Sequence, residues 1–458
     1  MTSRARRTVL ATAAALGTVA VSAVEAEAGG FYIHEQSAYF QGSSFAGVAA
    51  GGPSLSAMFW NPATITQHGR GMVAEVNGSA ILPRTEVFST TATLGPFNLA
   101  PLGSSTEMGT DAFVPSTYVV YGLTDRVSIG LAVNAPFGLN TKTIPNWSGM
   151  FYNRESDVFS LNANPNVAFK VTDWLSVAVG AQVQYFRVKL TSAVPFSGTF
   201  PPFGPLSPGT GVLRAESVDF GLTAGVTITP TPWTTIGLGY RSRIDQSLAG
   251  DQFRPELLLP PAPLTPVPRA MVKITAAVPL PDIATASIRQ KITESFTLLG
   301  TVEWTNWSRM GTIPIVPAVP TPFIATALPF EWDDGWMFAV GGEYQWSPTI
   351  ALRAGLAWEQ SPVNDEVRGL RLPDNDRLWL SAGLTYNWNE RIAIELGYSH
   401  VFTDDTPINV VPGNPNFDAN AGGSGTFVGT AKSQVDIVSF GFRYRFGAPA
   451  AAPIVTKG

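Results

Sequence analysis

The sequence predicts an all-β protein: a 14-stranded antiparallel transmembrane β-barrel with an N-terminal hatch (plug) inside it. Three observations predict this fold. The chain begins with an export signal, its strand segments alternate with a period of two, and short connections alternate strictly with long ones. Only 14% of its 458 residues are charged, which is below the roughly 25% of an ordinary soluble domain.

Residues 1–28 are interpreted as a cleaved signal peptide. Arg4, Arg6 and Arg7 precede an apolar, Ala-rich stretch over 9–24, and Ala26-Glu27-Ala28 forms a small-x-small cleavage site. No later run of 18 apolar residues could form a spanning helix. Because only helices and closed barrels satisfy every backbone group in hydrocarbon, we expect a barrel in the bacterial cell outer membrane.

Composition excludes several other classes of function. The chain has no Cys and only three His, so we expect no disulfide, no metal site and no cofactor. Its 29 basic and 34 acidic residues give a net charge of −5 without basic runs, which argues against nucleic acid as a partner. His400 has no evident catalytic partner in the sequence, so we expect no enzyme activity and no catalytic residue.

The segment 29–70 does not alternate and is rich in Gly, Ala and Ser. A barrel of this size needs filling, since about eight strands already pack solid with side chains. We therefore expect residues 29–70 to fold inside the barrel as the hatch.

Residues 71–446 contain the strand pattern. Ile392, Ile394 and Leu396, for example, alternate with Ala393 and Glu395, as in a wall with lipid on one side and a polar lumen on the other. Short turns and long outer loops separate the strands, and an even number of strands places both ends in the periplasm. The predicted strands are 71–82, 113–123, 127–137, 156–170, 174–190, 213–228, 233–246, 283–292, 295–305, 335–346, 350–360, 377–388, 391–402 and 433–446. Residues 447–458 form a C-terminal extension.

Three blocks of sequence carry a family resemblance. They are Gly30-Phe31-Tyr32-Ile33-His34-Glu35-Gln36-Ser37 with Ser56-Ala57-Met58-Phe59-Trp60-Asn61-Pro62-Ala63, then Ala135-Pro136-Phe137-Gly138, then Pro373-Asp374-Asn375-Asp376-Arg377. In this order they resemble the FadL/TodX family of outer-membrane transporters of long-chain fatty acids and aromatic hydrocarbons.

The resemblance implies a mechanism. Ligand is caught outside, passed to an inner pocket, and released sideways into the membrane where the third strand kinks. The implied gating residues of the hatch are Asn61, Pro62 and Ala63, which would meet that kink. The implied kink contains Asn134, Pro136, Phe137 and Gly138, and Pro136 cannot donate to the strand ladder. The alternative is a strand that simply ends at Pro136.

Two outer loops are unusually apolar. Residues 190–213 carry no charge before Arg214, and residues 257–264 lie among many prolines. Exposed apolar loops mark a binding surface, so we expect them to capture ligand. The candidate capture residues are Phe196, Phe200, Phe203, Leu206, Leu257, Leu258, Leu259 and Leu264.

The expected partners are a hydrophobic small-molecule ligand and outer-membrane lipid, and the barrel is expected to be a monomer. A general diffusion porin needs charged, hydrated loops, so this alternative is disfavoured. The other alternative is a structural or adhesin barrel. The sequence does not decide whether the ligand is a fatty acid or an aromatic hydrocarbon. A buried Arg or Lys beside the pocket would favour the acid.

Overall fold

The computed structural model describes residues 30–198, 207–259, 265–321, 326–417 and 425–447. The predicted signal peptide and all but the first residue of the C-terminal extension lie outside these ranges. Within them, no helix is both long enough and apolar enough to cross a membrane.

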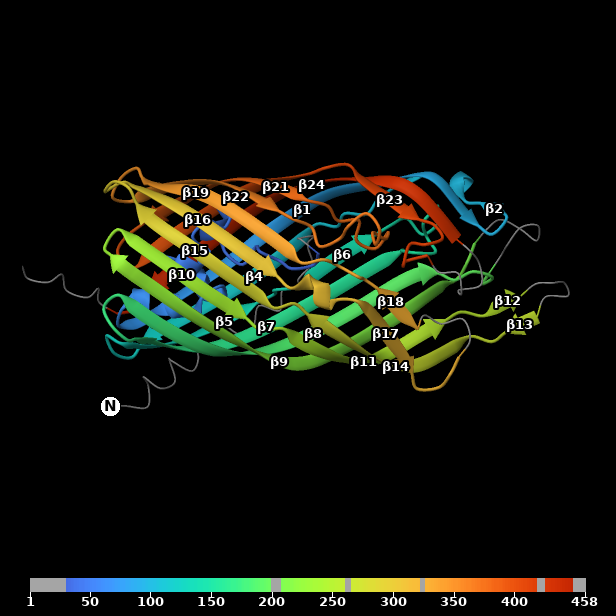
Figure 1. Ribbon diagram of the computed structural model, residues 1–458, viewed down its shortest axis with the longest axis horizontal. Helices are drawn as coiled ribbons and strands as arrows, with labels where there is room; N and C mark the ends of the chain where they lie inside the picture. Colours follow the sequence, from blue (N-terminus) through green and yellow to red (C-terminus); the bar gives the residue numbers. More distant parts are fainter. Residues whose placement is uncertain (1–29, 199–206, 260–264, 322–325, 418–424, 448–458) are drawn as a thin grey trace, which may run out of the picture.

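Fourteen antiparallel strands form a closed barrel, as predicted (Figure 1). The last strand pairs with the first over a long register that runs from Val73↔Arg445 to Leu94↔Gly425, and this pairing closes the wall. The wall strands are β1 (Gly71–Leu94), β4 (Ala112–Gly122), β5 (Val127–Asn134), β7 (Glu155–Lys170), β8 (Leu175–Ala193), β9 (Thr210–Thr231), β10 (Thr234–Arg241), β15 (Ile283–Lys291), β16 (Phe296–Thr305), β19 (Gly335–Gln345), β20 (Ile350–Glu359), β21 (Arg377–Asn387), β22 (Ile392–Thr403) and β24 (Gly425–Arg445).

The period-two pattern places one face of each strand outside and the other inside. On β8, Val179 and Val183 are exposed, whereas Gln182 and Gln184 are buried. Tryptophans beside the short turns are exposed, as expected for side chains at a membrane interface. They are Trp174, Trp233, Trp346 and Trp388.

The strands extend further outward than the sequence pattern predicted. The predicted loop 247–282 is largely strand, because β11 (Ile244–Arg254) and β14 (Ala270–Leu280) continue the wall beyond β10 and β15 and pair with each other. The predicted strand 233–246 is interrupted at Ser242 and Arg243. These corrections have one cause: backbone groups outside the membrane still gain hydrogen bonds by continuing the ladder.

Short elements complete the outer end of the barrel. They are β2 (Phe97–Asn98), β3 (Ser105–Glu107), β6 (Gly138–Lys142), β12 (Leu257–Leu259), β13 (Thr265–Val267), β17 (Thr312–Pro317), β18 (Ala327–Pro329) and β23 (Thr406–Val410), with the 3₁₀ helices η4 (Ala100–Leu102) and η5 (Trp307–Arg309).

Residues 30–70, which we call the hatch segment, lie in the lumen, and most of their side chains are buried. The segment holds only the short helices α2 (Ala38–Gln41), η1 (Val48–Ala50), η2 (Leu55–Phe59) and η3 (Pro62–His68). Its backbone lies directly on inward-facing glycines of the wall. A Cβ at Gly237 would come within 1.8 Å of the Ala49 carbonyl oxygen, and one at Gly239 within 1.9 Å of that of Trp60. These wall positions require glycine because the hatch segment approaches so closely.

Candidate functional site: the third-strand break and the apolar cavity

The third wall strand is broken between β5 and β6. The register of β5 with β4 runs only as far as Thr117↔Val133, and beyond it a single bridge joins Gly109 to Thr141. On its other side the strand stays paired with β7. The residues at the start of β4 therefore lack ladder partners toward β5, and the wall is interrupted on that side.

The start of the hatch segment covers this interruption from inside. The Gly138 N–H donates to the Phe31 carbonyl oxygen (2.9 Å), and the Ile33 N–H donates to the Pro136 carbonyl oxygen (2.9 Å). Pro136 has no N–H of its own, so its carbonyl is the group it offers. We call residues 31–36 the plug segment, because they pair with the break as a substitute strand.

Gln36 connects the two edges of the interruption. Its Nε2 donates to the Ala135 carbonyl oxygen (2.8 Å). Its own carbonyl oxygen accepts from the Ser116 hydroxyl (2.8 Å) and the Tyr118 hydroxyl (2.7 Å) of β4. Removing Gln36 from this position would break bonds to both sides of the break at once.

Phe31 lies in an aromatic cluster at the outer end of the plug segment. Its ring centroid is 4.8 Å from that of Trp307, 5.8 Å from Trp332 and 6.0 Å from Phe137. Phe137 belongs to the strand break, so this cluster joins the break to the plug segment by packing as well as by hydrogen bonds. The contacts of Phe31 with Trp307 and Phe137 are edge-to-face, and such contacts add about 0.5–1.5 kcal/mol each.

An apolar cavity of about 150 Å³ opens above Phe31. Most of its lining is aliphatic or aromatic and comes from β7, β8, β9, β11, β14 and the outer loops. The lining includes Phe31, Leu139, Val158, Phe186, Val188, Leu190, Leu248, Ile274, Met310, Ile313, Phe330, Trp332 and Leu372. Such a cavity holds the apolar part of a ligand.

Among the described residues that line this cavity, Arg371 is the one with a charged side chain. Its Nη1 donates over 3.3–3.5 Å to the neutral oxygens of Asn153, Ser156 and Thr191. Its apolar surroundings lower the pKa of Arg371 to about 10, so it stays charged at neutral pH. Within the described ranges, it forms no salt bridge.

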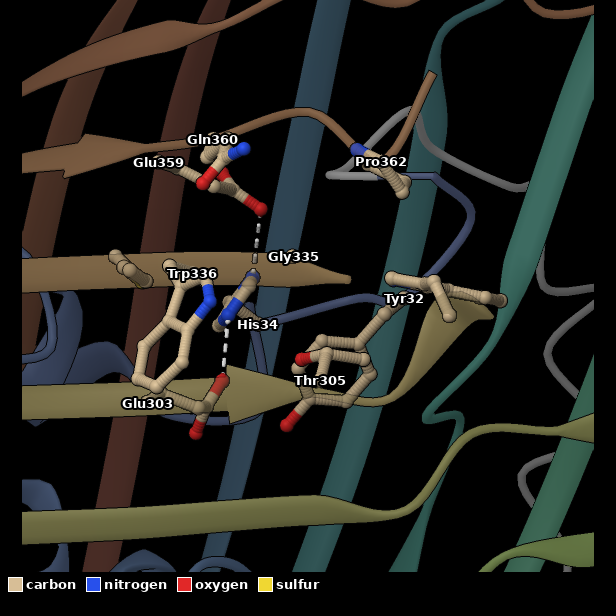
Figure 2. Close-up of a pocket in the computed structure, with 11 residues that line it drawn as sticks. Tyr32, His34, Glu303, Thr305, Gly335, Trp336, Glu359, Gln360 and Pro362 are labelled. Atoms are coloured by element: carbon tan, nitrogen blue, oxygen red, sulfur yellow. Dashed lines mark hydrogen bonds and ion pairs between the residues drawn. The ribbon is translucent and has the colours of Figure 1, made fainter. Parts of the chain in front are cut away.

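A second buried cluster holds the plug segment from the other side. The His34 Nε2 lies 2.9 Å from Glu303 Oε1, and its Nδ1 lies 3.8 Å from Glu359 Oε1 (Figure 2). All three side chains are buried. Burial alone would lower the pKa of His34, but the Glu359 and Glu303 carboxylates outweigh it and raise the pKa to about 9. The imidazolium therefore bridges two carboxylates of the wall.

Glu35 lies beside this cluster, and its carboxylate is fully buried. Neither oxygen has a hydrogen-bond partner among the described residues. Burial raises the pKa of Glu35 to about 7, against the opposing effect of His34.

The predicted hatch motif lies elsewhere in the lumen. Asn61 caps η3 through the Ala63 N–H, and its Nδ2 donates to the carbonyl oxygens of Ala49 (2.6 Å) and Val226 (2.9 Å). The hydrogen bonds to the strand break come from Phe31, Ile33 and Gln36. That Asn61, Pro62 and Ala63 meet the break stays a prediction. Their gating role stays a prediction.

The predicted capture residues are only partly described. Phe200, Phe203, Leu206 and Leu264 lie outside the described residues. Leu257 is buried in the hairpin of β12 and β13, and Leu258 and Leu259 are half-buried there; Phe196 accepts the Leu258 N–H at its carbonyl oxygen. None of these four lines the cavity. The capture role of all eight stays a prediction.

Neither Arg371 nor the His34 cluster was predicted from the sequence. The resemblance block contains His34, but nothing local shows that Glu303 and Glu359 face it. Arg371 stands just before the Pro373-Asp374 block, and no sequence signal distinguishes it from other loop arginines.

A closed, plugged β-barrel with an interrupted wall and an apolar interior defines an outer-membrane transport protein. A family model described as "Outer membrane protein transport protein (OMPP1/FadL/TodX)" matches residues 19–446, and the chain belongs to this family. The 47 kDa outer membrane protein of Pasteurella multocida is 26% identical to it, over 87% of this chain and 92% of the relative. A long-chain fatty acid transport protein of Salmonella typhi is 23% identical, over 89% and 95%.

Solved structures share the fold. A Pseudomonas aeruginosa FadL homologue superimposes with a TM-score of 0.78 at 21% identity, over 92% of this chain and 100% of that one. The Pseudomonas putida toluene transporter TodX gives a TM-score of 0.67 at 15% identity, over 90% and 99%. The protein is thus an outer-membrane transport protein.

Proposed function

We propose that this chain is a passive transporter of long-chain monocarboxylic acids. The ligand enters the apolar cavity from outside, and it leaves sideways through the break in the third strand. The single observation that carries this choice of ligand is Arg371, a charged group in a largely apolar lining that has no carboxylate partner among the described residues. An aromatic hydrocarbon would gain nothing from that charge, whereas a carboxylate gains a charge-assisted hydrogen bond of about 1.5–3 kcal/mol.

The plug segment acts as the gate. It contacts the ligand cavity through Phe31 and seals the break through Ile33 and Gln36. A ligand tail that displaces Phe31 therefore pulls on the same backbone that closes the wall. Residues 29–70 act as the hatch, residues 447–458 are the C-terminal extension of the chain, and the ligand passes unchanged, with no catalytic step. The barrel works as a monomer whose exposed apolar face contacts outer-membrane lipid.

The test is uptake of labelled oleate and labelled toluene by a bacterial host that lacks its own transporter of this family. We expect wild type to accelerate oleate uptake. Arg371→Leu should lower that rate at least tenfold, which is the effect of losing about 1.4 kcal/mol. Arg84→Leu is the matched control, because Arg84 is an exposed outer arginine paired with Asp111.

Toluene uptake separates the ligand classes. If wild type accelerates toluene and not oleate, the proposed ligand is wrong. If neither is accelerated while the purified protein conducts ions steadily, the barrel is a diffusion porin instead.

A further inference from the structure

Three amide side chains lie at one level on three neighbouring strands. Asn134 of β5 is in register with Asn162 of β7, and Asn162 is in register with Gln184 of β8. All three are fully buried and face the lumen. Asn134 Nδ2 donates to the Tyr118 hydroxyl (2.9 Å), and Asn162 Nδ2 donates to Gln184 Oε1 (3.3 Å).

The remaining polar atoms of these amides are unused. Asn134 Oδ1, Asn162 Oδ1 and Gln184 Nε2 have no hydrogen-bond partner among the described residues. Each unpaired buried polar atom costs about 1–3 kcal/mol, so three together are not explained by stability.

The next two inward-facing amides of β7, toward its periplasmic end, have hydrogen-bond partners. Asn164 Nδ2 donates to the Ala181 carbonyl oxygen (2.6 Å), and Asn166 Nδ2 donates to the Asn164 carbonyl oxygen (2.8 Å). Thr223 Oγ1 donates to Asn166 Oδ1 (3.1 Å). The side chains of Asn164 and Asn166 therefore hydrogen-bond to neighbouring groups of the wall. Asn134, Asn162 and Gln184 each keep one polar atom without a partner among the described residues.

The unpaired amides connect the cavity with the break. Val158 and Phe186 line the cavity, and Gln184 is the next inward-facing residue below Phe186, about 7 Å further along the strand. Asn134, at the other end of the row, is the last residue before the break. A ligand that moves from the cavity to the break passes this row.

We propose that Asn134, Asn162 and Gln184 form a headgroup strip: a binding site for the uncharged polar head of a departing amphiphile. This proposal rests on the proposed function. The strip offers two acceptor oxygens and one donor nitrogen, which match a hydroxyl or a protonated carboxyl. A protonated carboxyl would donate its O–H to Asn162 Oδ1 and accept from Gln184 Nε2.

Charges around the strip favour the neutral head. Asp219 is the register partner of Gln184 on the far side, and its carboxylate accepts the Ser247 N–H (2.9 Å). It would repel a carboxylate and direct a head toward Asn134. The positive charge of Arg241, toward the periplasmic end, is already engaged, because its N–H groups donate to the Phe59 carbonyl oxygen and to Gln182 Oε1. A tail that enters lipid first leaves its head in the lumen, where the strip replaces the hydrogen bonds of water.

The test uses the full chain and three labelled probes: oleate, oleyl alcohol and toluene. The variant is the double substitution Asn162→Leu and Gln184→Leu. The matched control is Gln252→Leu, an inward-facing amide of β11 nearer the outer end. We expect the double variant to slow uptake of oleate and oleyl alcohol about tenfold, with toluene uptake and the oleate Kd of the purified protein unchanged.

Three other results would overturn the proposal that these amides bind the head. Unchanged oleyl alcohol uptake in the double variant would show that an uncharged head does not bind the headgroup strip. An equal loss of toluene uptake would show a packing defect in the wall, and a weaker oleate Kd would assign the amides to the cavity. Failure of the proposed function looks different, because wild type itself would then accelerate no amphiphile.

Discussion

Removing the His34 imidazole should release the plug segment. In His34→Ala, Glu303 and Glu359 would remain buried without the cation that lies between them. Removing one partner from a buried ion cluster costs about 3–5 kcal/mol. The rise of the His34 pKa from 6.5 to about 9 corresponds to about 3 kcal/mol of favourable interaction, in agreement. We therefore expect the plug segment to open about a hundredfold more often.

The assay exploits the absence of cysteine from the chain. A single Ile33→Cys reporter, buried in the plug segment, is labelled by a maleimide only when the plug segment opens. His34→Ala should raise the labelling rate about a hundredfold. Replacing Glu303 and Glu359 by Gln in the same background should reverse most of the increase, because the two side chains that faced the imidazole then carry no charge.

The pH dependence has a defined sign. A raised pKa means that the charged His34 stabilises the closed segment fully below pH 6.5 and loses this effect as the pH rises through about 9. Wild-type labelling, divided by the rate of a free thiol at the same pH, should accelerate over that window, whereas the same ratio for His34→Ala should lack the step. His68→Ala is the control, because burial lowers the pKa of His68 to about 3 and leaves it neutral. Labelling of His34→Ala at the wild-type rate would refute the reasoning.

Glu35→Gln should slow the cysteine labelling about tenfold at pH 8. The raised pKa of Glu35 means that the closed segment loses stability as the pH rises from 4.5 through about 7, and Gln removes this loss. An unchanged labelling rate at pH 8 would contradict this. Gly239→Ala should displace the hatch segment and raise labelling at least tenfold, since a Cβ there meets the Trp60 carbonyl oxygen at 1.9 Å; Gly300→Ala, with its nearest contact at 3.3 Å, is the control. Asn61→Ala should abolish the uptake that wild type accelerates, and normal uptake by this variant would remove Asn61 from the gate.

The wall was predictable because its signal is local. Alternation with a period of two needs only neighbouring residues, and all fourteen strands were located from it. The outward continuation of β11 and β14 was missed, since strands outside lipid carry less apolar contrast. The break at Pro136 could be located because proline removes a ladder donor whatever surrounds it.

The site was harder to predict because its contacts are non-local. His34 and Glu303 are 269 positions apart, and Gln36 and Ala135 are 99 apart. Only closure of the barrel brings them together. Family resemblance directed attention to Asn61, which lies beside β9, whereas the plug contacts begin at Phe31.

The plug segment is short enough for one ligand to operate it. Five hydrogen bonds hold residues 31–36 to the break and to β4, at about 1 kcal/mol each. A tail that buries about six methylene groups against the cavity gains about 5 kcal/mol, at ~0.8 kcal/mol each. The two quantities are matched, so the burial of a long tail supplies enough free energy to drive the opening. His34 lies in the middle of the segment, and its ion cluster holds that point fixed. The ligand therefore moves Phe31 about an anchored residue, and it does not need to expel the hatch segment from the barrel.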